Sequence, residues 1–195
     1  MKILIASSNS GKIDEFKSIL KDFEVIPQKH LNIEDVEETG TTFSENALLK
    51  ANNGFLNSGL PSIGDDSGLI VPLLNGDPGL YSARYAGEHA TDQDNRDKLS
   101  QELKKLNVQQ TPASFICVIA VVNDQDLSKS LICEGRINGS ITVESSGHGG
   151  FGYDPMFIPQ NFEQTFAEID SALKHKISHR GQALAVLQEN LSKII

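Results

Sequence analysis

Short continuous runs of apolar residues alternate along this chain with apolar residues at helical spacing, which predicts alternating strands and helices. Residues 2–7, with the sequence KILIAS, predict a buried first strand. A loop follows, and the apolar residues behind it recur at helical spacing: Ile13, Phe16, Ile19 and Leu20. Residues 23–27 predict a second, short strand. The chain is therefore predicted to begin as strand, loop, helix and strand.

A second helix is predicted from the capping box of Thr42 and Glu45, two side chains that can each bond the other residue's backbone N–H. Its apolar stripe comprises Phe43, Ala47, Leu48, Ala51 and Phe55. The sequence Gly-Leu-Pro at 59–61 ends the helix. Residues 62–74 predict a strand pair around the sequence GDDSG, and a turn follows at 75–79.

The middle of the chain predicts a solvated helix and a central strand. Residues 82–87 predict one or two helical turns, and Thr91 or Asp92 caps the helix after them. The residues of this helix predicted to face the core are Leu99, Leu103 and Leu106. Residues 113–122 are the most apolar stretch and are rich in β-branched residues, which is typical of a central strand.

Residues 129–135 and 136–143 predict two antiparallel neighbours of that strand, and residues 156–158 predict a short one. The last helix is predicted over residues 178–194, with inward-facing Ala183, Leu184, Leu187 and Leu191. The pattern therefore predicts a mixed α/β fold with a parallel start and a long antiparallel middle. A chain of 195 residues is expected to form one domain, or two small lobes that share one core.

The composition is that of an ordinary globular protein, with 38% hydrophobic and 22% charged residues. No apolar run approaches the ~20 residues of a membrane span, and no signal peptide precedes the first strand, so we expect the protein to be cytoplasmic. Cys117 and Cys133 are expected to be small core side chains. The formal net charge of −9 argues against a nucleic-acid binder. It does not exclude a polyphosphate ligand, for which a few local cations suffice.

The sequence SSNSGK at 7–12 resembles a phosphate-binding loop. It joins a strand to a helix N-terminus, where free backbone N–H groups bind anions, and Lys12 adds a mobile cation. It departs from the Walker A motif, because Ala6 replaces the first glycine and Ile13 replaces the serine or threonine that would hold magnesium. The alternative is a plain strand–helix turn with a solvated lysine, and the loop alone does not decide between them.

Two adjacent carboxylates, Asp65 and Asp66, lie between apolar residues in GDDSG. In an extended backbone their side chains point to opposite faces, so only one of them can serve a given cleft. An unpaired carboxylate near the core is costly, and a divalent cation would remove that cost. The alternative is a polar turn with Asx hydrogen bonds. We favour the metal site.

Other polar residues nearby have simpler explanations. The acidic pair of Glu37 and Glu38 is typical of a solvated loop, and Glu45 is explained by the capping box. Asn46 and Lys50 share one helix face at i,i+4 and border its apolar stripe. The pattern does not decide whether these two residues face a cleft or solvent.

The sequence GGFGYDP at 149–155 pairs aromatic rings with glycines, which let a backbone approach a ligand closely. Phe151 or Tyr153 can stack on a base, and Asp154 can order the loop or bond a base edge. A hairpin loop with packed aromatics is the alternative. In SHRG at 178–181, His179 and Arg180 oppose the helix dipole, which is reasonable if their partner is an anion or a purine carbonyl.

Taken together and in order, five blocks resemble the inosine triphosphate pyrophosphatase family, whose members remove ITP, dITP and XTP. The blocks are SSNSGK, EETGTTFSENALLKA at 37–51, GDDSGLIV at 64–71 continuing to PGLYSARYAG at 78–87, GGFGYDP, and KHKISHRGQAL at 174–184. They span almost the whole chain. Two departures exchange one small residue for another: relatives often have alanine at position 64 and threonine at position 7.

The resemblance implies a role for each matched residue. Glu38 and Asp66 would bind Mg²⁺ or, in its place, Mn²⁺, and Asp66 would also be the general base. Lys12 would be the main cation for the triphosphate, and His179 and Arg180 would bond the oxidised purine edge. The implied substrate-binding residues are Ser7, Ser8, Asn9, Ser10, Gly11, Lys12, Lys50, Ser67, Phe151, Gly152, Tyr153, Asp154, Lys174, His179 and Arg180.

The implied protein is a single domain over residues 1–195, with a mixed, strongly twisted sheet flanked by helices and two lobes around a central cleft. It would be a cytoplasmic homodimer that binds a small-molecule purine nucleoside triphosphate, not a nucleic acid or a membrane. The implied reaction is Mg²⁺-dependent hydrolysis to the monophosphate and pyrophosphate. Two other classes stay open: another phosphate-site NTPase or kinase, and a non-catalytic nucleotide-binding module.

Overall fold

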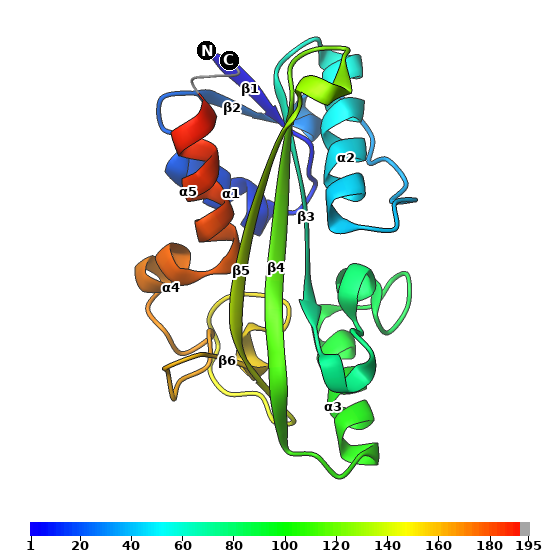
Figure 1. Ribbon diagram of the computed structural model, residues 1–195, viewed down its shortest axis with the longest axis vertical. Helices are drawn as coiled ribbons and strands as arrows, with labels where there is room; N and C mark the ends of the chain where they lie inside the picture. Colours follow the sequence, from blue (N-terminus) through cyan, green and yellow to red (C-terminus); the bar gives the residue numbers. More distant parts are fainter. Residues whose placement is uncertain (192–195) are drawn as a thin grey trace. The chain divides into compact units, whose positions relative to one another are not determined.

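A computed structural model describes residues 1–191 and contains a six-stranded mixed sheet (Figure 1). The strand order is β2 (Glu24–Pro27), β1 (Lys2–Ile5), β3 (Ser62–Ile70), β4 (Gln110–Val122), β5 (Leu131–Thr142) and β6 (Phe157–Pro159). β1 pairs in parallel with β2 and with β3, whereas β5 and β6 pair in antiparallel. The predicted α/β class and the predicted parallel start are confirmed.

The helices begin where local sequence provides caps. Within the described residues they are α1 (Ser10–Ile19), α2 (Phe43–Ser58), α3 (Asp92–Lys105), α4 (Ser171–Ile177) and α5 (His179–Leu191). Thr42 and Thr91 each form a capping box, with Glu45 and Asp94 respectively. α2 ends at Gly59, whose backbone is left-handed. Glycine adopts this conformation without strain. The predicted starts of α2 and α3 and the predicted end of α2 are thus confirmed.

Two predicted strand pairs are each a single strand in the structure. The sequence GDDSG lies inside β3, because Asp65 and Asp66 each have a lysine partner and therefore need no polar turn. Residues 129–135 and 136–143 were predicted as separate strands, but 131–142 form the continuous strand β5. The sequence-based prediction of a break was wrong in both places.

Two helical predictions also need correction. The pattern did not predict α4, whose first turn is capped by the side chain of Asp170. Leu106 is half exposed, because it is the C-cap of α3 and not part of its buried stripe. In α5 the predicted inward residues are buried: Ala183, Leu184, Leu187 and Leu191. Residues 192–194 of this predicted helix lie outside the described residues.

The chain divides into two compact units that alternate along the sequence. The first comprises residues 1–66, 117–135 and 182–195, and the second comprises residues 67–116 and 136–181. Each unit has its own cluster of buried apolar side chains. The single domain over residues 1–195 stays a prediction.

In the first unit, α1 and α5 pack on the sheet face that carries Ile3 and Ile5 (Figure 1). α2 packs on Leu4, which points to the other face, and Gly54 of α2 leaves no room there for a Cβ. Gly64 of β3 is as tightly enclosed, because an added Cβ would collide with the backbone of α2 at Ala47. Alanine at position 64 is therefore not a neutral exchange in this backbone.

The core of the second unit is aromatic. The ring centroids of Phe115 and Phe157 lie 4.7 Å apart, and those of Phe157 and Phe166 lie 5.2 Å apart. Leu99 and Leu103 of α3 are fully buried in the same cluster. These large side chains give a rigid base to the loops that carry the candidate base-binding residues.

Both cysteines are free and fully buried in the first unit, which confirms their prediction as core side chains. Burial raises the pKa of the Cys133 thiol to about 11, so this thiol stays protonated and unreactive at neutral pH. None of the described helices is long and apolar enough to cross a membrane.

Candidate active site

The predicted site residues form two groups, one in each unit. The first unit holds Ser7–Lys12, Glu38, Lys50 and Asp66. The second holds Ser67, Phe151, Gly152, Tyr153, Asp154, Lys174, His179 and Arg180. The groups meet in the sequence at Asp66 and Ser67, which are consecutive residues of β3.

The predicted phosphate loop joins β1 to the N-terminus of α1. The side chain of Asn9 caps the helix by accepting from the Lys12 backbone N–H at 3.1 Å, and Ser7 Oγ accepts from the Asn9 N–H at 3.2 Å. The first turn of the helix contains Ser10, Gly11 and Lys12. A polar loop, a helix N-terminus and a lysine are therefore together, an arrangement that can bind a polyphosphate.

Asp35 fixes this phosphate loop from another loop of the same unit. Its Oδ2 accepts from Ser8 Oγ at 2.8 Å, and its Oδ1 accepts from Gln28 Nε2 at 2.5 Å. Asp35 lies three residues before Glu38, so its loop connects the phosphate loop to a predicted metal ligand. Sequence reasoning missed Asp35, because its partner Ser8 is 27 residues away and no local motif marks the pair.

Lys50 of α2 lies between the two carboxylates that were predicted to bind metal. Its Nζ is 2.5 Å from Glu38 Oε1 and 3.1 Å from Asp66 Oδ1. Asn46, one turn earlier, donates from Nδ2 to Asp66 Oδ2 at 3.3 Å and accepts from the Gly40 N–H at 2.8 Å. The face shared by Asn46 and Lys50 is therefore directed at Asp66 and not at solvent. Sequence reasoning had left Asn46 without a role.

Burial dominates the electrostatics of this group. It raises the pKa of the Asp66 carboxyl, the neighbouring Glu38 carboxylate raises it further, and Lys50 and Lys12 act in the opposite direction. For Lys50, burial lowers the pKa, but the carboxylates of Asp66, Glu38 and Asp65 outweigh it and the net shift is upward. Lys50 therefore remains a cation between the carboxylates at neutral pH.

Asp65 lies on the opposite face of β3 from Asp66, as the strand geometry predicts, but it has a partner there. Its Oδ2 is 3.1 Å from Lys12 Nζ, and its side chain is fully buried. Cys117 Sγ contacts the same oxygen at 4.0 Å. A buried carboxylate that pairs with the phosphate-loop lysine holds that lysine in place before any ligand arrives. Asp65 is thus a third residue, after Asp35 and Asn46, with a role that the sequence did not reveal.

The residues of the first unit fit a magnesium ion. Glu38 and Asp66 already hold one cation, the Lys50 ammonium, between hard oxygen atoms. No cluster of three or more His, Cys, Asp or Glu able to hold a metal occurs among residues 1–191. Mg²⁺ sites in nucleotide enzymes characteristically use only one or two carboxylates, because water and substrate phosphates complete the coordination. The donor set therefore suits a metal that arrives with a phosphate ligand.

In the second unit, Asp154 orders the GGFGYDP loop. Its Oδ2 accepts from the Phe151 backbone N–H at 2.7 Å and from Lys174 Nζ at 2.6 Å. Tyr153 is buried and donates from its hydroxyl to the Ser82 carbonyl at 2.9 Å, so its ring is part of the core. Of the two rings predicted to stack on a base, Phe151 is the one that remains partly exposed.

Lys174 and Arg180 both lie close to the Phe151 ring. Lys174 Nζ is 5.1 Å from the ring centroid, and Arg180 Cζ is 5.7 Å from it. Arg180 is 2% exposed and donates from Nη2 to Ser67 Oγ at 3.1 Å. His179 is 8% exposed, and its ring stacks on Phe115 with 4.7 Å between centroids. Two cationic side chains and one aromatic ring are therefore adjacent, which suits an electron-rich heterocycle.

Gly181 is required by the close approach of α4 and α5. A Cβ at this position would collide with the carbonyl oxygen of His175, a backbone atom that cannot turn away. We therefore expect Gly181→Ala to displace the first turn of α5, which carries His179 and Arg180. Overpacking of this kind costs about 1–3 kcal/mol.

The measurement is urea unfolding of the Gly181→Ala variant against wild type. Gly59→Ala is not a suitable control, because Gly59 has a left-handed backbone. Ser171→Ala, at the exposed start of α4, is the control and is expected to unfold like wild type. Equal stability of the Gly181→Ala variant would contradict the steric argument.

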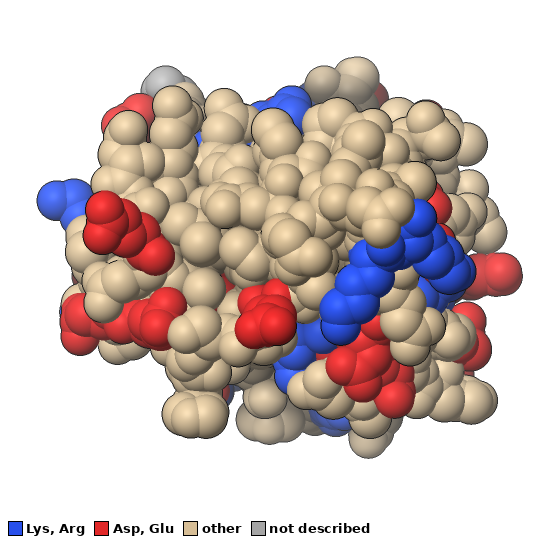
Figure 2. All heavy atoms as spheres, turned by 90° about the horizontal axis from the view of Figure 1, so that it is seen from below, with Lys and Arg blue, Asp and Glu red and all other residues tan. Residues whose placement is uncertain are grey.

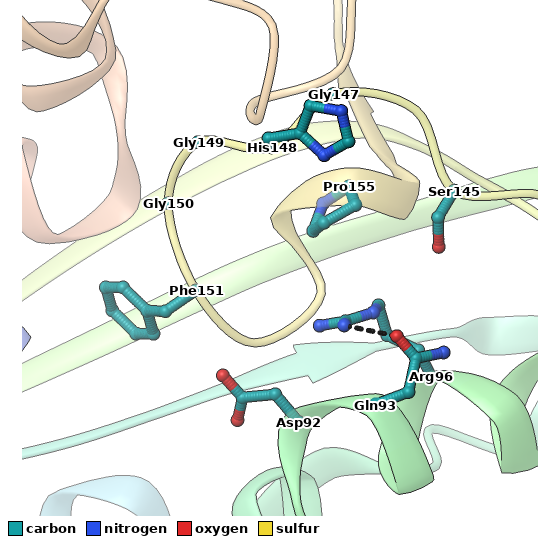
Figure 3. Close-up of a pocket in the computed structure, with 10 residues that line it drawn as sticks. All are labelled: Asp92, Gln93, Arg96, Ser145, Gly147, His148, Gly149, Gly150, Phe151 and Pro155. Carbon is teal, nitrogen blue, oxygen red and sulfur yellow. Dashed lines mark hydrogen bonds between the residues drawn. The ribbon is translucent and has the colours of Figure 1, made fainter.

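A pocket of about 480 Å³ lies beside the GGFGYDP loop in the second unit (Figure 3). One side is the N-terminal turn of α3, and the other is the loop itself. Its lining residues include Asp92, Gln93, Arg96, His148 and Phe151. Sequence reasoning did not predict this pocket, because Asp92 and Arg96 appear in the sequence as ordinary solvated residues of an exposed helix.

Charged side chains are mixed in sign on the face drawn in Figure 2. Its lysines and arginines lie beside acidic residues, and an uncharged area spans the middle of this face. The face drawn in Figure 2 therefore carries no broad basic surface, and the formal net charge of −9 is likewise not that of a basic protein.

Comparison with known proteins gives matches over almost the whole chain. The model of the Ham1 family matches residues 3–190. The dITP/XTP pyrophosphatase of Haemophilus influenzae is 50% identical over 193 residues, covering 97% of this chain and 98% of that protein. The dITP/XTP pyrophosphatase of Escherichia coli O157:H7 is 46% identical over 192 residues, with 97% and 98% covered.

Solved structures agree with the fold. A HAM1 protein from Coxiella burnetii superposes with a TM-score of 0.92 at 42% identity, and 99% of each chain is covered. The Ham1 protein of Staphylococcus aureus superposes with a TM-score of 0.87 at 41% identity, again with 99% of each chain covered.

Proposed function

Because the chain belongs to the Ham1 family, we propose that it hydrolyses non-standard purine nucleoside triphosphates to the monophosphate and pyrophosphate. The substrates are dITP, ITP and XTP. The observation that carries this proposal is the Lys50-bridged pair of Glu38 and Asp66 in the same unit as a phosphate-type loop. Relatives that are named dITP/XTP pyrophosphatases and that match 97% of this chain support it.

In this proposal the phosphate loop binds the triphosphate. Backbone N–H groups at the start of α1 and the Lys12 ammonium pair with phosphate oxygens, and Asp65 holds Lys12 in position for them. Asp66 accepts a proton from the attacking water, and its buried position favours a more basic carboxylate than one in solvent. Asn46 orients Asp66 for this step.

Glu38 and Asp66 would hold Mg²⁺, or Mn²⁺ in its place. The metal, when bound, supplies neutralisation of phosphate charge and polarisation of the scissile anhydride. The ammonium of Lys50 lies between these two carboxylates, and with Mg²⁺ bound to them it would be free to pair with a phosphate oxygen. Lysine suits this change, because its long side chain is flexible and its three donors rotate freely.

The second unit recognises the base in this proposal. The partly exposed Phe151 ring stacks on the purine, and Asp154 keeps Phe151 and Lys174 in place. Arg180 and His179 donate to the 6-oxo group of hypoxanthine or xanthine. Ser67 contacts the substrate next to Asp66 and accepts from Arg180.

The test is a screen of ITP, dITP, XTP, GTP and ATP with the purified protein and Mg²⁺, with separate detection of pyrophosphate and orthophosphate. We expect pyrophosphate from ITP, dITP and XTP, and none when EDTA replaces Mg²⁺. Orthophosphate alone would support the alternative of a γ-phosphate NTPase. Binding of nucleotide without turnover would support a non-catalytic binding module.

Metal binding gives a further prediction, on Glu38. Glu38→Gln keeps the size of the side chain and removes its charge, so the Mg²⁺ concentration for half-maximal activity should rise by about tenfold or more. Glu37→Gln changes an exposed neighbour in the same way and is the control, for which no rise is expected. An equal Mg²⁺ requirement in both variants would remove Glu38 from the metal site.

Three further expectations stay predictions. They are a homodimeric state, a cytoplasmic location and a small-molecule partner in place of a nucleic acid. Sedimentation of the purified protein over a range of concentrations measures the first of them, and a single monomeric species would contradict it.

A further inference from the structure

The backbone of Gly152, in the GGFGYDP loop, is held by two side chains of α3. Its N–H donates to Asp92 Oδ2 at 2.7 Å, and its carbonyl accepts from Arg96 Nη1 at 2.6 Å. Asp92 and Arg96 are four residues apart and therefore lie on one face of the helix. Figure 3 shows both side chains on the α3 side of the pocket, next to the loop. We call these two hydrogen bonds the Gly152 clamp.

The clamp is built on a firmly held helix end. Arg96 Nη2 also donates to Gln93 Oε1 at 2.7 Å, the contact drawn as a dashed line in Figure 3. Asp92 is the first residue of α3, directly after the Thr91 cap, where the helix dipole favours a carboxylate. Both side chains are charged, so their hydrogen bonds to the loop are of the stronger kind.

No neighbouring atom packs in the direction of a Gly152 side chain. A Cβ at this residue would meet no atom within 4 Å, and its backbone is in the left-handed region at φ +58°. Gly150 of the same loop differs in this respect, because an added Cβ there would collide with the Asp154 carboxylate. The two hydrogen bonds of the clamp are therefore the polar contacts that fix the Gly152 backbone.

The clamp acts on Phe151, the preceding residue. Asp154 fixes the other polar groups of Phe151: the Phe151 N–H donates to the Asp154 carboxylate at 2.7 Å, and the Phe151 carbonyl accepts from the Asp154 N–H at 3.2 Å. The peptide between Phe151 and Gly152 is thus held from two sides. Loss of the hydrogen bonds to Gly152 would allow this peptide to turn and would move the Phe151 ring away from Lys174 and Arg180.

We propose that Asp92 and Arg96 are positioning residues for base binding, which hold the Phe151 ring where a purine stacks on it. This inference rests on the proposed function, in which Phe151 lines the base site. Stacking on an aromatic ring does not distinguish one purine from another, because every base has a π-face. The clamp therefore sets affinity for purine nucleotides in general, whereas selectivity belongs to Arg180.

The kinetic test compares Arg96→Ala and Asp92→Ala with wild type. We expect KM for ITP and for ATP to rise by about tenfold, the size of a lost base stack, while kcat stays within about twofold and the ITP/ATP ratio of kcat/KM is unchanged. Inorganic tripolyphosphate, which has no base, should inhibit all variants equally. Asp92→Asn keeps an acceptor for the Gly152 N–H and should restore most of the affinity.

The control is the double variant Glu102→Ala and Lys105→Ala, which removes one acidic and one basic side chain, a surface ion pair, from the other end of the same helix. It should behave as wild type. Thermal unfolding of every variant shows whether α3 itself has been weakened.

A second measurement needs no substrate. The chain contains no tryptophan, so Phe151→Trp introduces a single tryptophan at the loop, which can be excited apart from the three tyrosines. Acrylamide should quench it more strongly, by about twofold, when Arg96→Ala is added, because a released loop exposes the ring. If the wild-type protein does not hydrolyse purine triphosphates, the proposed function fails. The quenching measurement alone then shows whether the clamp holds the loop. Equal quenching with and without Arg96, or a KM no higher than in the control variant, overturns the inference.

Discussion

Replacing Asp66 with asparagine is expected to lower kcat by about a hundredfold or more, the usual contribution of a positioned general base. Asparagine has nearly the same shape, but its amide cannot accept a proton from the attacking water. It is also a poorer metal ligand than a carboxylate. The fold should persist, because Asn46 and Lys50 retain a polar partner at position 66 and Lys50 keeps its contact with Glu38. The measurement is steady-state hydrolysis of ITP with pyrophosphate detection, after circular dichroism has confirmed the fold.

Asp65→Asn is the matched control for this experiment, since it makes the same chemical change at the adjacent residue. It leaves Asp66 untouched but removes the charge that holds Lys12. We expect a smaller effect of about tenfold, carried mainly by KM, because a charge-assisted contact to the phosphate-loop lysine is weakened. Asp66→Asn activity within a few-fold of wild type would remove Asp66 from the role of base, and equal losses in both variants would mean that the two carboxylates cannot be assigned separate roles.

The second large effect is expected at Arg180, where alanine should abolish the preference for ITP over ATP. Hypoxanthine and xanthine carry a 6-oxo acceptor where adenine has an amino donor. Donors on Arg180 pair with the oxo group and would be left unpaired, in a buried position, by ATP. A site built to bond one polar group can reject an analogue without it by roughly four to five orders of magnitude. Arg180→Ala should therefore lower kcat/KM for ITP far more than for ATP.

Arg136→Ala is the control for Arg180→Ala. Arg136 is an arginine of the same unit that also bonds a serine hydroxyl, Ser114 Oγ, at 2.9 Å, but it is exposed. Values of kcat/KM for ITP, XTP, GTP and ATP are needed for both variants and for wild type. If the Arg180→Ala protein keeps the wild-type ITP/ATP ratio, the SHRG segment binds phosphate or only begins a helix, and the purine is recognised elsewhere. Arg180→Lys separates loss of charge from loss of the planar guanidinium.

Features encoded by neighbouring residues were predictable from the sequence. The capping boxes at Thr42 and Thr91 and the glycine after α2 depend on contacts within a few residues, and all three helix boundaries were found. The break predicted at GDDSG was wrong for the opposite reason. Two carboxylates side by side look like a turn until Lys12 and Lys50, distant in sequence, are brought to opposite faces of β3.

The same limit applies to the candidate site. Helical spacing placed Asn46 and Lys50 on one face but did not say which way that face points. The answer came from Gly54 and Gly64, which let α2 approach β3 closely enough for both side chains to reach Asp66. The Gly152 clamp joins residues 56 and 60 positions apart, so no local pattern contained it.

The alternation of the two units along the chain has a consequence for synthesis on the ribosome. The core of the first unit includes Ala183, Leu184 and Leu187 of α5, although β1 of the same core is made long before α5. The first unit therefore cannot close until α5 has left the exit tunnel. We expect the apolar face of β1 and β4 to stay uncovered until then. During that interval the nascent chain presents a surface of the kind that chaperones bind.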